Sequence, residues 1–380
     1  MKRNTKLEII ESAIKLKADN PLDNPSLQDI VTSIGISKAA VYRHFKNKQE
    51  LDDEIDSVLN EDAARFFEIA NQNPKDIAPI LILLANYCVK KNHHMRVLFI
   101  KVMKNAVLRS KFCQLFTGKG YREDTIATIF MATLFGIHVE DLRITKKDVK
   151  ENEIEKIVSH IITCLDNGIL EFNDIDKNKI HKIFMNSIPK DEDIKEDKYL
   201  NALSDLIVKS GISSITIKNI ALTLGQAEST LYSKFTTKEE MIRYTARKEL
   251  KNLLLPLQKK MEEYDESSEK LIAMFSFISN YIALSPELTS YILLLCIPRN
   301  QEKGHFIVED FYNMISCIPI QDIHVKYDSN IEHLKFWCFA LAVVLGITTR
   351  QQTLKDRKDS IFSILDYIRN GIYTDNKENI

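Results

Sequence analysis

Residues that make turns and cross-links are scarce in this chain of 380 residues. Ten glycines and nine prolines are too few for the closely spaced turns of an all-β protein. The six cysteines lie far apart and form no Cys-x-x-Cys pair, which argues against a disulfide framework and against a thiolate zinc site. We therefore expect an all-α fold whose cysteines are buried thiols.

Long apolar runs and an excess of charge are missing too. The N-terminus has no apolar run of the signal-peptide kind, and no stretch reaches the roughly 18 uncharged apolar residues of a membrane span. A net charge of −1 gives no indication of a polyanionic partner. The length and the 44% of hydrophobic residues are enough for two or three domains. Because apolar runs of the signal-peptide and membrane-span kinds are missing, we expect a cytoplasmic protein without membrane contact.

Catalytic and metal-binding motifs are also absent from the sequence. There is no GxGxxG, P-loop or GxSxG sequence, and no acid, base and nucleophile that spacing alone would group. His93 and His94 are adjacent and point to different helix faces, while His138 and His160 lack the i, i+4 partner of a helical metal site. We expect neither an enzyme nor a bound metal or cofactor.

What the chain does contain is one segment twice. Ser26–Leu51, SLQDIVTSIGISKAAVYRHFKNKQEL, recurs without a gap 190 residues later as Thr216–Met241, TIKNIALTLGQAESTLYSKFTTKEEM. The two copies share, among other residues, the glycines Gly35 and Gly225. A period of half the chain favours a duplicated protein over a solenoid, whose repeats run to roughly 20 to 50 residues.

The first copy has the signals of a helix-turn-helix. After an amphipathic first helix, Ser26 predicts the N-cap of a short second helix that ends at Gly35, where a left-handed turn costs least. Ser37 can cap a third helix through Phe45, and Asn47 resembles the start of a capping box that opens a fourth. The later helix of such a unit can enter a DNA major groove.

The outer surface of this unit is basic. Between Ser37 and Lys48 the sequence has four basic residues and no acidic one. Basic residues often do no more than solvate a surface, and short helix-turn-helix units also serve as packing motifs. The placement of charge and of Tyr42 favours DNA binding over that alternative.

Both copies resemble the N-terminal domain of the bacterial TetR family of transcriptional regulators. That domain runs from a capped Thr or Ser, through a buried Ile-Ala pair and a turn glycine, to Tyr-x-x-Phe and a Lys that opens the fourth helix. The resemblance covers about 45 residues in each copy. The matching residues are Ser26, Ile30, Val31, Gly35, Ser37, Tyr42, Phe45 and Lys48 in the first copy and Thr216, Ile220, Ala221, Gly225, Tyr232, Phe235 and Lys238 in the second.

The resemblance implies a set of DNA-binding residues, because in this family the third helix reads bases while the Tyr and the Lys contact phosphates. Arg43 can donate two hydrogen bonds to a guanine edge and so specify, whereas Lys48 offers sequence-independent attraction to phosphate. The expected DNA-binding residues are Ser26, Ser37, Lys38, Ala39, Ala40, Tyr42, Arg43, His44 and Lys48 in the first copy and Thr216, Glu228, Ser229, Thr230, Tyr232, Ser233, Lys234 and Lys238 in the second.

The second copy departs from the pattern at two positions. Ala227 stands where a capping Ser is expected, at a typical cost of ~1 kcal/mol of helix stability. Glu228 replaces Lys38 at the point nearest the DNA, and the net charge from Ala227 to Lys238 is +1 rather than +4. Since Glu can accept from cytosine, this copy either reads a different base or has lost DNA contact.

Each copy continues into a predicted helical body. Asp174 is the expected cap of a short helix in the connection between the copies, and long helices are expected from Arg122 to about Leu142 and from Asp148 to Asn167. The predicted domains are the first DNA-binding head (1–50), the first regulatory and dimerisation body (51–169), the linker (170–195), the divergent second head (196–241) and the second body (242–380).

TetR-like regulators pair through their last two long helices into a four-helix bundle and bind near-palindromic operators as two-fold dimers. Because one chain here supplies both halves, the resemblance implies an intramolecular pseudo-dimer on an asymmetric double-stranded DNA operator. The alternative is a homodimer of two such chains. The residues expected to face one another are Phe130, Leu134, Ile157 and Ile161 from the first body and Trp337, Leu341, Ile361 and Leu365 from the second.

Members of the family commonly enclose a pocket, which implies a small apolar or aromatic ligand and a ligand-responsive repressor. The alternative function is a TetR-like ligand or protein sensor in which one or both heads no longer bind DNA. Aromatic and Met stripes at helical spacing are usually ordinary core. The candidate lining residues are Tyr87, Met95, Phe99, Met103, Phe112 and Phe116 in the first body and Phe275, Phe277, Tyr281, Tyr291, Phe306, Phe311 and Tyr312 in the second.

Overall fold

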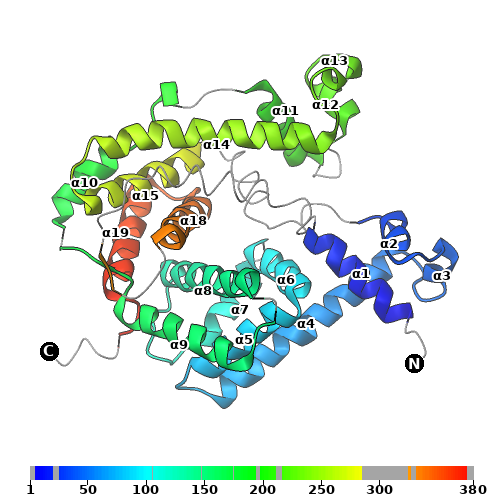
Figure 1. Ribbon diagram of the computed structural model, residues 1–380, viewed down its shortest axis with the longest axis horizontal. Helices are drawn as coiled ribbons and strands as arrows, with labels where there is room; N and C mark the ends of the chain where they lie inside the picture. Colours follow the sequence, from blue (N-terminus) through cyan, green and yellow to red (C-terminus); the bar gives the residue numbers. More distant parts are fainter. Residues whose placement is uncertain are drawn as a thin grey trace. The chain divides into compact units, whose positions relative to one another are not determined.

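The computed structural model describes residues 5–19, 25–104, 106–146, 148–173, 175–193, 197–210, 216–284, 324–326 and 331–374. These residues are almost entirely helical, in agreement with the predicted all-α fold (Figure 1). The chain forms two compact units. Unit 1 comprises Met1–Glu123, His138–Ile162 and Thr374–Ile380, and unit 2 comprises Asp124–Ile137 and Thr163–Tyr373.

The N-terminal part of unit 1, which we call the first head, consists of three helices that pack on the start of a fourth. These are α1 (Thr5–Asp19), α2 (Leu27–Ile34), α3 (Lys38–Tyr42) and the long α4 (Lys48–Gln72). Their apolar faces share one core, so that each short helix is stabilised by its neighbours. The buried side chains of this core include Ile9, Ile14, Ile30, Val41, Phe45, Leu51 and Ile55.

Side-chain caps define the ends of these short helices. The Ser26 hydroxyl accepts from the Asp29 N–H (3.2 Å), and the Asp29 carboxylate accepts from the Ser26 N–H (2.8 Å), which is a complete capping box. Ser37 caps α3 by accepting from the Ala40 N–H, and Asn47 caps α4 by accepting from the Glu50 N–H. The Glu50 carboxylate accepts from the Lys46 N–H, one residue before the N-cap, so the capping box predicted at Asn47 is not reciprocal. Gly35 ends α2 with a left-handed φ of 69°, as the sequence predicts.

Helix α3 is shorter than predicted, because it ends at Tyr42 and does not continue through Phe45. The N–H groups of His44 (2.9 Å) and Phe45 (3.0 Å) both bond to the Val41 carbonyl, and this shared acceptor breaks the regular ladder. The extra turn still brings Phe45 into the core, where it is 2% exposed. Arg43 and His44 consequently lie in a turn after the helix.

The body of unit 1 continues through α5 (Ala78–Lys90), α6 (Asn92–Lys104), α7 (Ala106–Cys113) and the 3-10 turn η1 (Gln114–Phe116). Helices α8 (Thr125–Thr145) and α9 (Glu151–Asn167) contribute residues to both units. Both begin three residues later than predicted. Asp124 caps α8 through the Ala127 N–H (2.8 Å), and the Glu153 carboxylate accepts from the Lys150 N–H (3.0 Å) just before α9.

Unit 2 contains a second head with the same order of elements. Its helices are α11 (Lys198–Ser210), α12 (Ile217–Thr223), α13 (Glu228–Tyr232) and α14 (Lys238–Glu262). Gly225 again takes a left-handed φ, here 61°. The Gln226 N–H bonds to the Ala221 carbonyl (2.9 Å), as the Ile36 N–H does to the Val31 carbonyl (3.1 Å) in the first head.

The core of unit 2 is centred on α15 (Ser267–Leu284), which is buried continuously from Leu271 to Ile282. It packs against α14, α10 (Lys177–Asn186), α18 (Ile331–Thr349) and α19 (Leu354–Asn370). Helix α10 is the helix predicted in the connection, but Asp176 stands at its N-cap and makes no side-chain cap bond. The predicted cap, Asp174, lies outside the described residues.

The C-terminal ends of α9 and α19 meet backbone to backbone within unit 2. The Ile169 N–H donates to the Ile368 carbonyl, and the Ile372 N–H donates to the Leu165 carbonyl, both at 2.7 Å. The two bonds are reciprocal, since each joins the residue after one turn glycine to the last turn of the opposite helix. The glycines are Gly168 (φ 76°) and Gly371 (φ 74°). We refer to this contact as the junction of α9 and α19.

Lys326 joins the same two helix ends. Its ammonium donates to the carbonyl of Asn167 (2.7 Å) and to that of Arg369 (2.6 Å), so one cation serves two carbonyl-rich helix ends. Beside it, the short strands β1 (Leu170–Glu171) and β2 (His324–Val325) pair antiparallel.

Aromatic side chains continue this contact toward α8. Phe130 lies edge-on to Trp337 at a centroid distance of 5.6 Å, a contact the sequence analysis predicts, and to Tyr367 at 6.1 Å. The Tyr367 hydroxyl donates to Asp124 (2.6 Å). Within unit 2 the start of α8 is thereby fixed to both α18 and α19.

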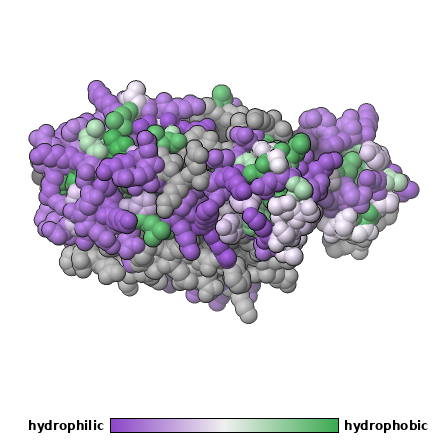
Figure 2. All heavy atoms as spheres, turned by 90° about the horizontal axis from the view of Figure 1, so that it is seen from above, coloured by the Kyte–Doolittle hydropathy of each residue, from purple (hydrophilic) through white to green (hydrophobic). Residues whose placement is uncertain are grey.

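One described helix is long and apolar enough to cross a membrane by length and composition alone. It covers Thr125–Arg143 in α8, and 47% of its residues are buried within the protein. Core helices of globular proteins pass the same test. Hydrophilic residues predominate on the face shown in Figure 2, where hydrophobic residues are scattered.

The junction of α9 and α19 predicts that Gly168 tolerates substitution less well than Gly35. A Cβ at Gly168 would lie 2.4 Å from the Arg369 backbone, whereas a Cβ at Gly35 meets nothing within 4 Å, and both glycines have a left-handed φ. Gly35→Ala should lower the free energy of unfolding by about 1 kcal/mol, and Gly168→Ala by about 3 kcal/mol. Urea unfolding followed by circular dichroism measures both, and equal losses would contradict the close approach.

Candidate nucleic-acid interface

The residues between Lys38 and His44 that are predicted to contact DNA lie on the surface of the first head. Tyr42 is 54% exposed although it is a large aromatic residue. Lys38, Ala39, Arg43 and His44 are exposed as well, and Ala40 is half-buried. The core of the head takes Val41 and Phe45 from the same segment. The structure therefore brings these predicted DNA-contacting side chains together on the segment from Lys38 to His44.

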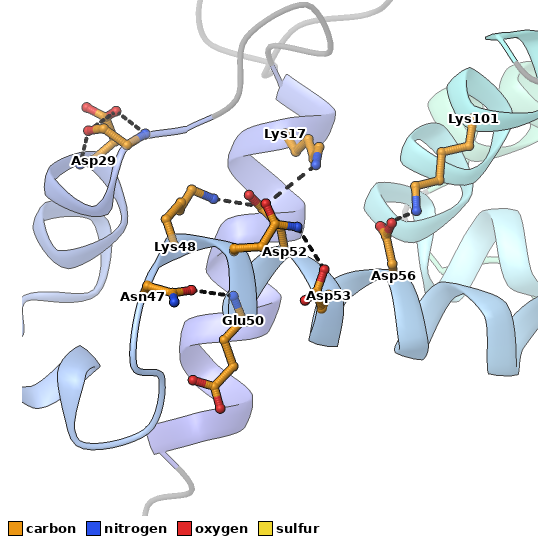
Figure 3. A network of polar contacts seen from close by, with 11 residues as sticks. Lys17, Asp29, Asn47, Lys48, Glu50, Asp52, Asp53, Asp56 and Lys101 are labelled. Atoms are coloured by element: carbon orange, nitrogen blue, oxygen red, sulfur yellow. Dashed lines mark hydrogen bonds and ion pairs between the residues drawn. The ribbon is translucent and has the colours of Figure 1, made fainter.

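Lys48 is held by an acidic neighbour. Its ammonium lies 2.8 Å from the Asp52 carboxylate, one helical turn further along α4, and the Lys17 ammonium approaches the same carboxylate at 4.0 Å (Figure 3). The i, i+4 spacing of Lys48 and Asp52 is a sequence signal that could have predicted this pair. An ammonium has three donors, so a contact with one carboxylate leaves Lys48 able to donate to phosphate.

Lys17 has the more buried side chain of the two lysines that approach Asp52. Burial lowers the pKa of its ammonium, and the negative charges of Asp52 and Asp56 raise it in part. Asp56 also pairs with Lys101 of α6 (Figure 3). The start of α4 thus connects to both α1 and α6 through ion pairs.

The hydroxyls of the two predicted capping serines, Ser26 and Ser37, differ in their remaining capacity to donate a hydrogen bond. The Ser26 hydroxyl donates to Asp29 (2.6 Å) and also accepts from the Asp29 N–H, so its one hydrogen is already used. Hydrogen bonds from the Ser26 hydroxyl and N–H hold the pKa of the Asp29 carboxyl below its usual range. The Ser37 hydroxyl accepts from the Ala40 N–H (3.2 Å), a contact that uses a lone pair and not its hydrogen.

The second head presents a different surface. Tyr232 is 55% exposed, much as Tyr42 is, and Glu228 lies exposed in the first turn of α13. Lys234 points at Tyr199, with its ammonium 3.1 Å from the hydroxyl and 5.8 Å from the ring centroid. Ser229, Thr230 and Ser233 are exposed, Thr216 caps α12, and the side chain of Lys238 lies outside the described residues.

Several predicted pocket residues of the first body are part of its aromatic core. Tyr87 lies 5.3 Å from the ring of Phe66, and Phe112 lies 6.2 Å from Phe66 and 5.8 Å from Phe67. Met95 and Phe116 are half-buried. The side chains of Phe99 and Met103 lie outside the described residues. The pocket stays a prediction.

In the second body, Phe277 stacks on Tyr281 at 5.9 Å, and the Tyr281 hydroxyl donates to Glu249 (3.1 Å). Glu249 is 3% exposed, and burial raises the pKa of its carboxyl. Phe275 is fully buried. The other predicted lining residues, Tyr291, Phe306, Phe311 and Tyr312, lie outside the described residues.

Two further polar groups escaped the sequence analysis because their members lie far apart in the chain. Among the described residues, no three His, Cys, Asp or Glu side chains form a possible metal site. The rings of His138 in α8 and His160 in α9 nevertheless lie tilted to one another at a centroid distance of 5.2 Å, and burial lowers the pKa of His160. The other group surrounds Asp62 and includes His94 and Tyr87.

The missing cap of the second head leads to a testable difference. Ala227 takes an extended conformation before α13 but makes no side-chain cap bond, as predicted, whereas Ser37 does so at the same position of the first head. Ala227→Ser should raise the free energy of unfolding by about 1 kcal/mol, and Ser37→Ala should lower it by a similar amount. Chemical denaturation checks both. Destabilisation by Ala227→Ser would show that α13 does not begin as described.

Comparisons with known proteins address the first head directly. Residues 9–55 match the family described as "Bacterial regulatory proteins, tetR family". No curated protein sequence matches the chain. Among solved structures, it is similar to the crystal structure of the transcriptional regulator FadR from Bacillus subtilis in complex with stearoyl-CoA. The likeness has 19% identity and a TM-score of 0.38, over 46% of this chain and 98% of that one. Residues 9–55 are thus an N-terminal domain of the TetR family.

Proposed function

We propose that this chain is a transcriptional regulator that binds DNA sequence-specifically through the first head. The observation that carries the proposal is the exposed set of Lys38, Tyr42, Arg43 and His44, inside the segment that matches the TetR family. An exposed tyrosine beside three potential cations has the chemistry of a surface that contacts both phosphates and base edges.

Arg43 and the lysines have different roles on this surface. The guanidinium of Arg43 can donate two parallel hydrogen bonds to a guanine, and this geometry distinguishes one base pair from another. Lys46 and Lys48 carry point charges that attract any phosphate and release counterions, whatever the sequence. Arg43 would therefore determine which duplex is bound, and the lysines how tightly.

This division predicts distinct losses for two variants. With duplexes selected from a random library at low salt, Arg43→Ala should reduce discrimination between the selected and a scrambled duplex by roughly 5- to 150-fold, equivalent to ~1 to 3 kcal/mol. Lys46→Ala should weaken both duplexes alike and reduce the salt dependence by about one ion. Fluorescence anisotropy measures both effects, with the exposed Lys355→Ala of α19 as control. Failure to select any duplex would sink the proposal.

We further propose that one chain supplies both halves of a TetR-like dimer. Support comes from the two heads, which share their order of helices and their turn glycine. The reciprocal bonds of Ile169 and Ile372 support it too. In a two-fold interface the same residues on both sides make the same contact, so reciprocal hydrogen bonds are expected there. A single-chain dimer is free to use two unlike heads, and its operator would be asymmetric.

Mass and operator symmetry test the single-chain dimer. At micromolar concentration we expect a species with the mass of one chain, 43.9 kDa, in sedimentation. Reversing one half of the selected duplex should weaken binding by at least about tenfold, since each mismatched base pair costs ~1 to 3 kcal/mol. A species of twice the chain mass, or equal binding to a perfect palindrome, would contradict the single-chain arrangement.

The regulatory role that fits this architecture is a ligand-responsive repressor whose bodies bind a small apolar or aromatic molecule. The second candidate is a ligand or protein sensor in which the second head no longer binds DNA. It is favoured by the acidic Glu228 and by the hydrogen bond between Lys234 and Tyr199. Alanine substitution separates them. Equal loss of affinity for Lys38→Ala and Glu228→Ala would mean that both heads bind DNA.

A further inference from the structure

Two lysines of the first head approach the same carboxylate. Lys17 lies in the last turn of α1, Lys48 is the first residue of α4, and Asp52 follows one helical turn later. The Oδ1 atom of Asp52 is 2.8 Å from the Lys48 ammonium and 4.0 Å from the Lys17 ammonium (Figure 3). The three side chains are only 18% to 29% exposed, so solvent screens their charges in part.

The two contacts of Asp52 differ in kind. The Lys48 ammonium donates a hydrogen bond to the carboxylate, whereas the Lys17 ammonium, at 4.0 Å, is beyond hydrogen-bond distance and acts through its charge. Asp52 and Lys48 by themselves are a neutral pair, which attracts a phosphate much less than a net cation does. With Lys17, the cluster of two ammonium groups and one carboxylate carries one positive charge.

Lys17 is able to supply this charge. Burial lowers the pKa of its ammonium, and the carboxylates of Asp52 and Asp56 oppose that shift. A lysine loses its proton near neutral pH only when it is fully buried, and 24% of the Lys17 side chain is exposed. Asp56 has a cation of its own, Lys101 of α6, so the charge of Lys17 remains to balance that of Asp52.

The second copy lacks both the carboxylate and the cation that balances it. At the shift of 190 residues, the lysine that opens the fourth helix is kept as Lys238. Ile207 stands in place of Lys17, and Ile242 stands in place of Asp52. The two charges thus occur together in the first copy and are replaced together in the second. This pattern is expected if Lys17 serves to balance Asp52.

We propose that Lys17 is a positioning residue for DNA binding, whose ammonium neutralises the Asp52 carboxylate and so leaves the charge of Lys48 to a DNA phosphate. The inference rests on the proposed function, in which Lys48 attracts phosphate. Lys17 acts through Asp52 and not by contact with DNA, so its effect on affinity exists only while that carboxylate is present. Because phosphate contacts carry no sequence information, the effect is the same for every duplex.

A double-mutant cycle tests this dependence at neutral pH, with the affinity of the full chain for the selected and the scrambled duplex as the readout. Lys17→Gln should weaken both duplexes alike, by about fivefold at low salt, and reduce the salt dependence by about one ion. Asp52→Asn alone should bind at least as tightly as the parent. In that background, Lys17→Gln should change affinity by less than about twofold. Lys17→Met keeps the apolar stem of the side chain and should behave as Lys17→Gln does.

Lys101→Gln is the matched control. The Lys101 side chain is 27% exposed, close to the 24% of Lys17, and pairs with Asp56 one turn further along α4. Its substitution removes an ion pair of similar burial without touching Asp52, so affinity and salt dependence should stay as in the parent. Urea unfolding of each variant shows that it is folded.

Three results would overturn the inference. The first is an unchanged affinity of Lys17→Gln. The second is an equal loss from Lys17→Gln with and without Asp52, which would show that Lys17 contacts DNA itself. The third is a loss from Lys101→Gln as large as that from Lys17→Gln, because the effect would then belong to any ion pair of α4. A parent that binds no duplex would instead overturn the proposed function, on which this inference depends.

Discussion

Two helix ends that would ordinarily avoid one another meet in unit 2. The last carbonyls of α9 and α19 lack partners in their own helices and carry partial negative charge, so their approach needs compensation. The crossed bonds from Ile169 and Ile372 supply two donors, and Lys326 supplies a positive charge to both ends. In the same unit, Trp337 of α18 and Tyr367 of α19 pack on Phe130 of α8.

The parts of the head that the sequence predicts well are those set by neighbours in the chain. Ser26, Gly35 and Asn47 act within three or four residues of themselves, so caps and turn are visible in the sequence. The exposed position of Tyr42 follows from the helical period, because Val41 and Phe45 must turn inward. The end of α3 was missed, since two N–H groups that share one carbonyl leave no trace in composition.

Interactions between distant parts of the chain could not be predicted in the same way. The contacts of His94 with Glu11 and Asp62 join residues that differ by 83 and 32 positions. Lys326 meets Asn167 across 159 positions. A single sequence gives no spacing rule for such contacts, and each of these side chains read by itself is an ordinary polar residue. These contacts can be recognised only once the folded backbone has brought the residues together.

The crossed bonds between α9 and α19 have a further consequence, because both helices belong to one chain. Two separate subunits find one another at a rate and to an extent set by their concentration, which for a scarce protein can be very low. Two helices of one chain instead meet at an effective concentration that the chain between them sets. The contact between these two helices therefore does not depend on the concentration of the protein.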